Sequence, residues 1–132
     1  MGFAFKANTN DTRESPAIKI CKDLLEEGSF LSIYDPKVEI NQIEKDLEIN
    51  PLETNQGKIK RHSLKANSLE NAIEDSHAII ILTEWEEFLN LEWDLLVKKM
   101  NRPPWIFDTR SIVNIQEAEK SGINVWQVGY GN

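Results

Sequence analysis

Three cationic side chains follow the ends of predicted strands in a chain that is otherwise acidic. Lys6 and Arg13 lie in a polar loop after a short apolar run, and Arg110 follows a second apolar run. Lysine supplies a point charge, and arginine can bind a phosphate group through two parallel hydrogen bonds. Because the net charge is -7, an anion site in this chain must be local. The three cations predict a diphosphate site.

The loop that carries Lys6 and Arg13 runs into a predicted helix. Ser15 is a typical N-cap, and Pro16 is typical of the first helical position. In this order of elements, a strand is followed by a polar loop and then by the first turn of a helix. The free N–H groups and the positive end of the helix dipole then lie beside the loop. This order is typical of anion sites in α/β folds.

The elements that position these side chains alternate along the chain. Short apolar runs bounded by turn residues predict strands at 3–5, 30–34, 59–64, 78–82, 105–107 and 123–128. Apolar residues at helical spacing predict helices at 16–27, 40–47, 68–75, 93–100 and 115–120. The alternation predicts a Rossmann-like, three-layer α/β/α sandwich with a mostly parallel sheet of about five strands. Ligands of such sheets gather at the carboxyl ends of the strands.

Two segments of this pattern have a more specific interpretation. The run 78–82 is apolar throughout, which predicts a central parallel strand covered on both faces. The polar run 53–60 predicts a surface excursion.

Length and composition limit the classes of protein that fit. The 132 residues predict one domain, residues 1–132, with no internal repeat or linker. The acidic balance argues against a nucleic-acid partner. The single cysteine excludes an internal disulfide and fits a reducing compartment. No apolar run approaches the roughly 20 residues that span a bilayer, so we expect no membrane contact and a cytoplasmic location.

Five short motifs occur in a fixed order along the chain. They are Gly2-Phe3-Ala4-Phe5-Lys6, Asp11-Thr12-Arg13-Glu14-Ser15, Tyr34-Asp35-Pro36, Thr83-Glu84-Trp85 and Phe107-Asp108-Thr109-Arg110. This set strongly resembles the C-terminal, UDP-binding domain of the UDP-glucose 6-dehydrogenase (UDP-glucose/GDP-mannose dehydrogenase) family. The resemblance covers essentially the whole chain, and the first motif is its most specific part.

The resemblance implies a substrate and a cofactor. Enzymes of this family oxidise UDP-glucose to UDP-glucuronate in two NAD-dependent steps through a cysteine-linked intermediate. By resemblance, Phe5, Lys6 and Arg110 bind the UDP part of the substrate. Arg13 would reach toward NAD that is held by the N-terminal domain. The implied ligands are therefore UDP-glucose or UDP, with NAD as the cofactor of the whole enzyme.

The sequence lacks two features that such an enzyme needs. It has no Gly-x-Gly-x-x-Gly fingerprint for a dinucleotide. The family's nucleophilic cysteine belongs to a region not present here, and Cys21 lies on the apolar face of the first predicted helix. We therefore expect no catalytic residue in this chain and no activity when it is alone. Its partners would be the missing N-terminal and central domains, with a homo-oligomer as a further option.

Several residues have an alternative interpretation that the sequence leaves open. The three cations could be solvated charges or, for Arg110, a partner of a nearby carboxylate. Asp35 could be the ribose-binding acid of a dinucleotide fold, but the missing glycine fingerprint favours a turn cap before Pro36. We predict packing roles for Trp85, Phe88 and Trp93, structural roles for His62 and His77, and a solvated acidic face rather than a metal site for Glu84, Glu86 and Glu87.

Two other functions compete with the dehydrogenase domain. The first is a stand-alone nucleotide-binding or protein-interaction module that kept the fold. The second is a flavodoxin-like signalling receiver, which needs an acidic pair near the first strand, a phosphorylatable aspartate after the third and a lysine after the fifth, whereas this chain has Lys6 after the first strand. The receiver ranks last for that reason.

The first predicted strand is short for a central strand. Only residues 1–5 are available, whereas a central strand usually has about five or six residues. We expect that apolar residues preceding Gly2 in a full-length enzyme are absent here. A modest stability and a tendency to self-associate would follow.

Overall fold

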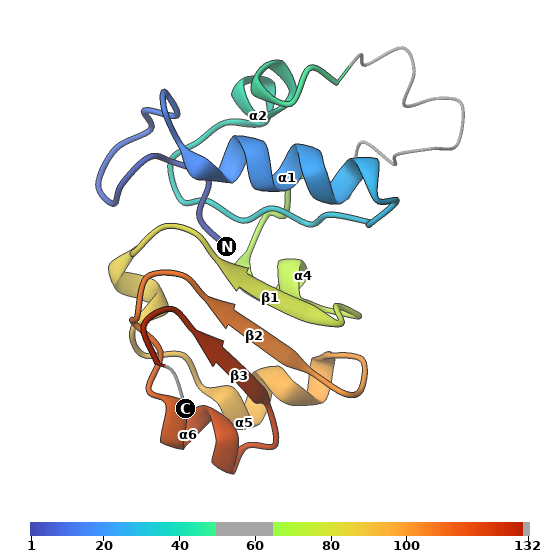
Figure 1. Cartoon of the computed structure of the whole chain (residues 1–132), viewed down its shortest axis with the longest axis vertical. Helices are drawn as coiled ribbons and strands as arrows, with labels where there is room; N and C mark the ends of the chain where they lie inside the picture. Colours follow the sequence, from blue (N-terminus) through green and yellow to red (C-terminus); the bar gives the residue numbers. More distant parts are fainter. Residues whose placement is uncertain (50–64, 131–132) are drawn as a thin grey trace.

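The computed structural model describes residues 1–49 and 65–130 of the chain (Figure 1). The predicted surface excursion 53–60, the predicted strand 59–64 and His62 lie outside the described residues. The elements in order are α1 (Pro16–Glu26), α2 (Ile40–Asp46), α4 (Leu69–Ile73), β1 (Ala78–Ile81), η2 (Glu86–Phe88), α5 (Trp93–Leu96), η3 (Val97–Lys99), β2 (Trp105–Asp108), α6 (Ile115–Lys120) and β3 (Asn124–Gln127).

The strands β1, β2 and β3 form one parallel sheet in that order. Ala78 pairs with Trp105, and Trp105 pairs with Asn124, which fixes the register of all three strands. A parallel sheet with helical crossovers agrees with the α/β class that the alternation predicts. Figure 1 shows α5 and α6 beside β2 and β3, and α1 and α2 beyond β1.

The two faces of the sheet differ in burial. Ile79, Ile81 and Ile106 are buried on one face. On the opposite face, Trp105 and Trp126 are 39% and 47% exposed. The prediction that β1 is covered on both faces holds only in part, because Ala78 is exposed and Ile80 is half-buried. One face of β2 and β3 therefore presents bare aromatic rings.

The helix α1 forms where its sequence predicts. The Ser15 hydroxyl accepts a hydrogen bond from the N–H of Ala17, and Pro16 occupies the first turn. Lys19 and Asp23 form an ion pair of 2.7 Å one helical turn apart. The helix ends before Gly28, whose φ of +84° is far more favourable for glycine than for other residues.

The core contains the aromatic residues for which packing is predicted. Trp85, Phe88 and Trp93 are all buried, at 5%, 1% and 6% exposure. Phe3 and Ile81 lie in the same cluster. These rings therefore stabilise the fold, as the sequence predicts.

The structure contradicts the predicted first strand. None of residues 3–5 is in a strand, residues 4–6 form bends, and Gly2 has a φ of +81° that turns the chain away from an extended path. The predicted strand 30–34 is reduced to a single bridge between Ile33 and Lys65. Within residues 1–49 and 65–130 the structure thus has three strands, and the predicted number of about five is not confirmed. The physical reason is that the N–H groups of Phe3 and Ala4 bind a side chain, Asp35, instead of a neighbouring strand.

None of the helices within residues 1–49 and 65–130 combines the length and the hydropathy of a membrane span.

Candidate functional site

The loop that leads from Gly2 to α1 is held at its start by one buried carboxylate. Asp35 Oδ2 accepts hydrogen bonds from the backbone N–H groups of Phe3 at 2.7 Å and Ala4 at 2.9 Å. Asp35 Oδ1 accepts from the N–H groups of Lys37 and Val38, both at 2.9 Å. Burial alone would raise the pKa of Asp35, but these four backbone N–H groups hold it below its usual value. The turn-capping role predicted for Asp35 is therefore confirmed.

The carbonyl groups of the same loop are bound by two buried hydroxyl groups. Ser15 Oγ donates to the carbonyl oxygen of Phe3 at 2.8 Å. Thr83 Oγ1 donates to the carbonyl oxygen of Ala4 at 2.7 Å. The loop backbone is thus fixed to α1 on one side and to the end of β1 on the other.

The start of α1 anchors this loop and is not open to solvent. Ser15 and Ala17 are buried, and the N–H of Ala17 already donates a hydrogen bond to the hydroxyl of Ser15. Pro16 has no N–H, and the N–H of Ile18 donates to the carbonyl oxygen of Ser15 at 3.2 Å. The cationic side chains, rather than these helix N–H groups, are the groups that an anion could reach.

Arg110 lies where the ends of β1 and β2 meet the loop. Its Nε donates to the carbonyl oxygen of Leu82 at 2.8 Å, and its Nη2 lies 3.5 Å from the carbonyl oxygen of Phe5. The backbone N–H of Arg110 donates to Asp108 Oδ1 at 2.9 Å. The structure therefore brings together Phe5 and Arg110, two of the residues that the resemblance assigns to UDP binding.

A carboxylate competes for the same guanidinium. Glu84 Oε2 lies 3.3 Å from Arg110 Nε, at a side-chain exposure of 41% for Glu84 and 30% for Arg110. That oxygen accepts no hydrogen bond from the described residues, because the Nε–H points to the carbonyl group of Leu82. The contact is therefore an ion pair without a hydrogen bond, which an anion could displace. This pairing is the alternative that the sequence leaves open for Arg110.

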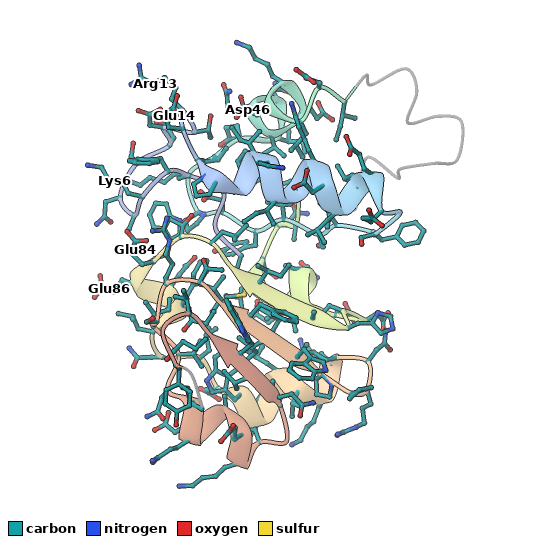
Figure 2. The ribbon with its side chains drawn as sticks, in the orientation of Figure 1. Lys6, Arg13, Glu14, Asp46, Glu84 and Glu86 are labelled. Atoms are coloured by element: carbon teal, nitrogen blue, oxygen red, sulfur yellow. The ribbon has the colours of Figure 1, made fainter. Side chains whose placement is uncertain are left out.

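Arg13 and Lys6 lie on the outer part of the loop and do not contact Arg110. Arg13 Nε and Nη2 bind the two oxygens of Asp11 at 3.0 and 2.8 Å, with 87% of the Arg13 side chain exposed. These hydrogen bonds lower the pKa of Asp11 to about 2. The carbonyl group of Asp11 accepts from the N–H of Phe5 at 2.8 Å, which ties the outer loop to its inner part. Lys6 is exposed, and Figure 2 shows Lys6 and Arg13 on the same edge of the molecule.

Asp108, at the end of β2, is a second structural carboxylate, a role that the sequence alone did not predict. Its oxygens accept hydrogen bonds from the N–H groups of Arg110, Ile112 and Val113 and from Gln127 Nε2, at 2.7 to 2.9 Å. Asp108 shapes the loop that presents Arg110. The signal for this role was present, because an aspartate directly after an apolar strand run commonly binds backbone N–H groups that follow it.

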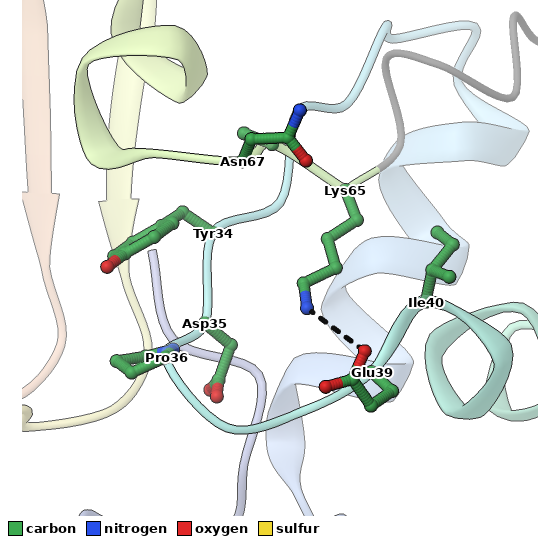
Figure 3. A pocket seen from close by; sticks show the side chains of 8 residues that line it. Tyr34, Asp35, Pro36, Glu39, Ile40, Lys65 and Asn67 are labelled. Carbon is green, nitrogen blue, oxygen red and sulfur yellow. Dashed lines mark ion pairs between the residues drawn. The ribbon is translucent and has the colours of Figure 1, made fainter.

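A polar pocket of about 650 Å³ lies beside the buried carboxylate of Asp35 (Figure 3). Tyr34, Ile40 and Asn67 contribute to its walls. Lys65 Nζ and Glu39 Oε2 face each other there at 3.8 Å. Asp35 itself is committed to backbone N–H groups, so it is not free to bind a ribose, in agreement with the missing glycine fingerprint.

Comparison with known proteins identifies the family. Residues 1–115 match the family described as UDP-glucose/GDP-mannose dehydrogenase family, UDP binding domain. UDP-glucose 6-dehydrogenase 2 of Arabidopsis thaliana is 40% identical over 138 residues, which cover 98% of this chain and 28% of that protein. UDP-glucose 6-dehydrogenase of Drosophila melanogaster is 41% identical over 129 residues, which cover 98% of this chain and 27% of that protein.

The fold is shared with a more distant solved structure. The crystal structure of NDP-N-acetyl-D-galactosaminuronic acid dehydrogenase from Methanosarcina mazei Go1 superimposes with a TM-score of 0.74 at 22% identity. The superposition covers 97% of this chain and 23% of that chain. This chain thus spans only about a quarter of the length of the proteins that it matches. It belongs to the UDP-glucose/GDP-mannose dehydrogenase family and corresponds to the family's C-terminal, UDP-binding domain.

Proposed function

We propose that this chain supplies the UDP-sugar-binding part of an NAD-dependent UDP-glucose 6-dehydrogenase, which oxidises UDP-glucose to UDP-glucuronate. The observation that carries the proposal is the 3.5 Å approach of Arg110 Nη2 to the main chain of Phe5 at the carboxyl ends of the strands. Relatives named UDP-glucose 6-dehydrogenase, 40% and 41% identical over nearly the whole chain, support the choice of substrate.

The diphosphate would bind between Arg110 and the loop. Arg110 Nε is held by the carbonyl group of Leu82, so the guanidinium is fixed in orientation while its outer N–H groups can donate to phosphate oxygens. Lys6, exposed on the loop, adds a point charge without a fixed geometry. Phe5 presents its main chain to Arg110, and its ring is 45% exposed. These three groups form the proposed substrate site.

The ion pair with Glu84 sets a condition on binding. A phosphate that approaches Arg110 must replace the carboxylate of Glu84 or share the guanidinium with it. Glu84 Oε2 accepts no hydrogen bond from the described residues. A phosphate that replaces Glu84 at Arg110 therefore breaks only an ion pair and forms charge-assisted hydrogen bonds instead. The exchange favours a doubly charged diphosphate over a singly charged anion.

The chain's own thiol does not fit the role of the catalytic nucleophile. Cys21 is buried on α1, and burial raises its pKa to about 11, so the thiol stays protonated at neutral pH. We therefore assign the nucleophile and the NAD site to the remainder of the enzyme. By the family resemblance, Arg13 would reach toward this NAD; its side chain is 87% exposed and its guanidinium is bound by Asp11. NAD, when bound by the whole enzyme, accepts the hydride.

The partners proposed for the chain are UDP-glucose or UDP and the other domains of the dehydrogenase. A cytoplasmic location is proposed with them, because one buried cysteine fits a reducing compartment.

Calorimetric titration of the 132-residue protein with UDP, UDP-glucose and NAD tests this function. We expect weak binding of UDP and UDP-glucose and no measurable binding of NAD. Arg110→Gln should weaken UDP binding about tenfold or more, since a charge-assisted hydrogen bond contributes about 1.5–3 kcal/mol. Lys6→Gln should weaken it less, because an exposed point charge contributes less.

Matched controls separate the site from the general charge of the protein. Arg102→Gln and Lys19→Gln remove the same charges from exposed positions outside the proposed site and should leave UDP binding unchanged. NAD binding without any response to UDP would contradict the assignment. Production of NADH from UDP-glucose by the pure chain, abolished by Cys21→Ser, would show that the chain is an enzyme by itself.

A further inference from the structure

Gln127 is the last residue of β3, and the register of the sheet pairs it with Asp108, the last residue of β2. Paired residues of neighbouring strands project their side chains from the same face of the sheet. The amide of Gln127 therefore reaches the carboxylate of Asp108, and Nε2 donates to Oδ2 at 2.7 Å. The same nitrogen donates to the carbonyl oxygen of Val113 at 3.1 Å. One amide thus joins both ends of the loop 109–113, which carries Arg110.

The carboxylate of Asp108 connects this amide to Arg110. Asp108 is buried, and its Oδ1 accepts a hydrogen bond from the N–H of Arg110 at 2.9 Å. Its Oδ2, which Gln127 binds, also accepts from the N–H groups of Ile112 and Val113, both at 2.8 Å. The two oxygens belong to one planar group, so a contact that fixes Oδ2 also fixes Oδ1. Gln127 therefore helps to hold the main chain of Arg110 although it does not contact that residue directly.

The ends of two strands hold the middle of the same loop. Ser111 has a φ of +57°, a left-handed conformation that residues other than glycine adopt at a cost and keep only where the surroundings fix it. Its hydroxyl donates to the carbonyl oxygen of Val128, the residue after Gln127, at 3.0 Å. On the other side, Thr109 Oγ1 donates to the carbonyl oxygen of Ile81 at 2.7 Å. The loop is therefore a fixed support, to which the end of β3 contributes two contacts.

We propose that Gln127 is a positioning residue of the substrate site, which acts through Asp108 to hold Arg110 in the orientation that binds the diphosphate. The inference rests on the proposed function of Arg110 and adds a residue from a strand that the proposed substrate site does not include. A two-pronged contact with phosphate depends on the orientation of the guanidinium plane, so residues that fix the arginine contribute to affinity.

The contacts of the guanidinium explain why such support matters. Arg110 Nε donates to the carbonyl oxygen of Leu82 at 2.8 Å, and the carboxylate of Glu84 lies 3.3 Å from the same nitrogen. If the main chain of Arg110 shifts, the hydrogen bond to Leu82 lengthens and the guanidinium can turn toward Glu84. The support from Gln127 therefore keeps the outer N–H groups of Arg110 directed toward a phosphate.

The test replaces the amide by an apolar side chain of similar size. Gln127→Leu removes both hydrogen bonds at a half-buried position, and we expect UDP to bind about threefold or more weakly, within the range for residues of one hydrogen-bond network. Asn124→Leu is the matched control at the opposite end of β3, where Asn124 Nδ2 donates to the carbonyl oxygen of Pro104 at 3.2 Å. This control removes a similar hydrogen bond and should leave UDP binding unchanged. NMR titration measures both affinities.

Two further measurements separate positioning from a general loss of stability. The NMR resonance of the Arg110 Nε–H reports its hydrogen bond to Leu82 without any ligand. Gln127→Leu should move this resonance toward that of a solvated arginine, and Asn124→Leu should not. The second measurement repeats Gln127→Leu in an Arg110→Lys background. A lysine keeps the charge but has no planar fork to orient, so the change in UDP affinity should fall below about 1.5-fold.

Three results would overturn the proposal. They are an Arg110 Nε–H resonance that Gln127→Leu leaves unchanged, equal UDP affinities of Gln127→Leu and Asn124→Leu, and an undiminished effect of Gln127→Leu in the Arg110→Lys background. A native protein that does not respond to UDP would contradict the proposed function instead. The Nε–H resonance would then still decide whether Gln127 positions Arg110.

Discussion

A Cβ atom on Gly2 would lie 2.5 Å from Cβ of Thr83, so the two backbones approach as closely as the absence of a side chain allows. Gly2 also has a φ of +81°, which other residues adopt only at a cost. We expect Gly2→Ala to lower the free energy of unfolding by about 2–4 kcal/mol, from overpacking and backbone strain together. Urea denaturation measures this change.

Gly122→Ala is the matched control for that contact. Gly122 has a φ of +86°, and a Cβ atom there would meet nothing within 4 Å in the described parts of the chain, so only the backbone strain applies. Its cost should be about 1–2 kcal/mol. Equal costs for the two variants would show that the approach to Thr83 adds nothing to stability.

Asp35→Asn should destabilise the protein strongly. The substitution replaces a carboxylate that accepts four backbone hydrogen bonds and one from Trp85 Nε1 at 3.2 Å. We expect a loss of about 3 kcal/mol, measured by urea denaturation at neutral pH. Asp23→Asn, on the exposed surface of α1, removes the same charge and should cost less than about 1 kcal/mol.

The contribution of Asp35 should also depend on pH. Its pKa is lowered in the folded protein, so the unfolded chain binds the proton more readily. The stabilisation is therefore complete above the ordinary aspartate value of 3.8 and is lost as the pH falls below it. The difference in stability between the native protein and Asp35→Asn should shrink in that acidic range. A constant difference would contradict the lowered pKa.

Glu84→Gln should strengthen UDP binding. The change removes the negative charge that pairs with Arg110 at 3.3 Å and puts an amide of nearly the same shape in its place. We expect a gain of about twofold to fivefold in affinity, which corresponds to an exposed ion pair of up to about 1 kcal/mol. Glu86→Gln removes the same charge from an exposed position nearby and provides the control (Figure 2). Equal gains from both variants would indicate a general charge effect rather than competition for Arg110.

The bare aromatic face of β2 and β3 should promote self-association. Trp105 and Phe107 stack at 5.8 Å, and Phe107 meets Trp126 at 6.3 Å, all on the exposed side of the sheet. We expect Trp126→Ser to lower the fraction of oligomers at high protein concentration in sedimentation velocity. Leu89→Ser removes a comparable apolar side chain, 49% exposed and outside β2 and β3, and should have little effect. Oligomers that persist unchanged in Trp126→Ser would exclude this face as their contact.

Local sequence patterns predicted most of the helices and strands correctly, because helix caps and apolar strand runs act through residues close together in the chain. Ser15 and Pro16 define the start of α1 through contacts within one helical turn. The run 78–82 produces β1 because β-branched apolar residues favour a buried strand wherever the partner lies. The carboxyl ends of β1 and β2 then bring Arg110 to the loop of Phe5, as the parallel topology predicts.

The failures have a common physical cause in contacts between distant residues. Phe3-Ala4-Phe5 has the composition of a strand, but Asp35, 32 positions from Phe3, takes up the N–H groups that a strand would pair. The ion pair between Glu84 and Arg110 also depends on how two loops pack, so the sequence offered a nearby carboxylate for Arg110 only as an alternative. No local pattern encodes such contacts, so the sequence predicted that Phe5 and Arg110 lie at the same edge of the sheet but not their hydrogen-bond partners.

The hydrogen bonds that fix the loop before α1 have a consequence for the thermodynamics of recognition. Since Asp35, Ser15 and Thr83 already hold its backbone, a nucleotide that binds there would not have to order it. The entropy lost on binding would come mainly from the side chains of Lys6 and Arg110 and from the ligand itself. If the nucleotide binds as proposed, this loop would act as a rigid receptor, and its affinity would respond to changes in charge far more than to changes in loop flexibility.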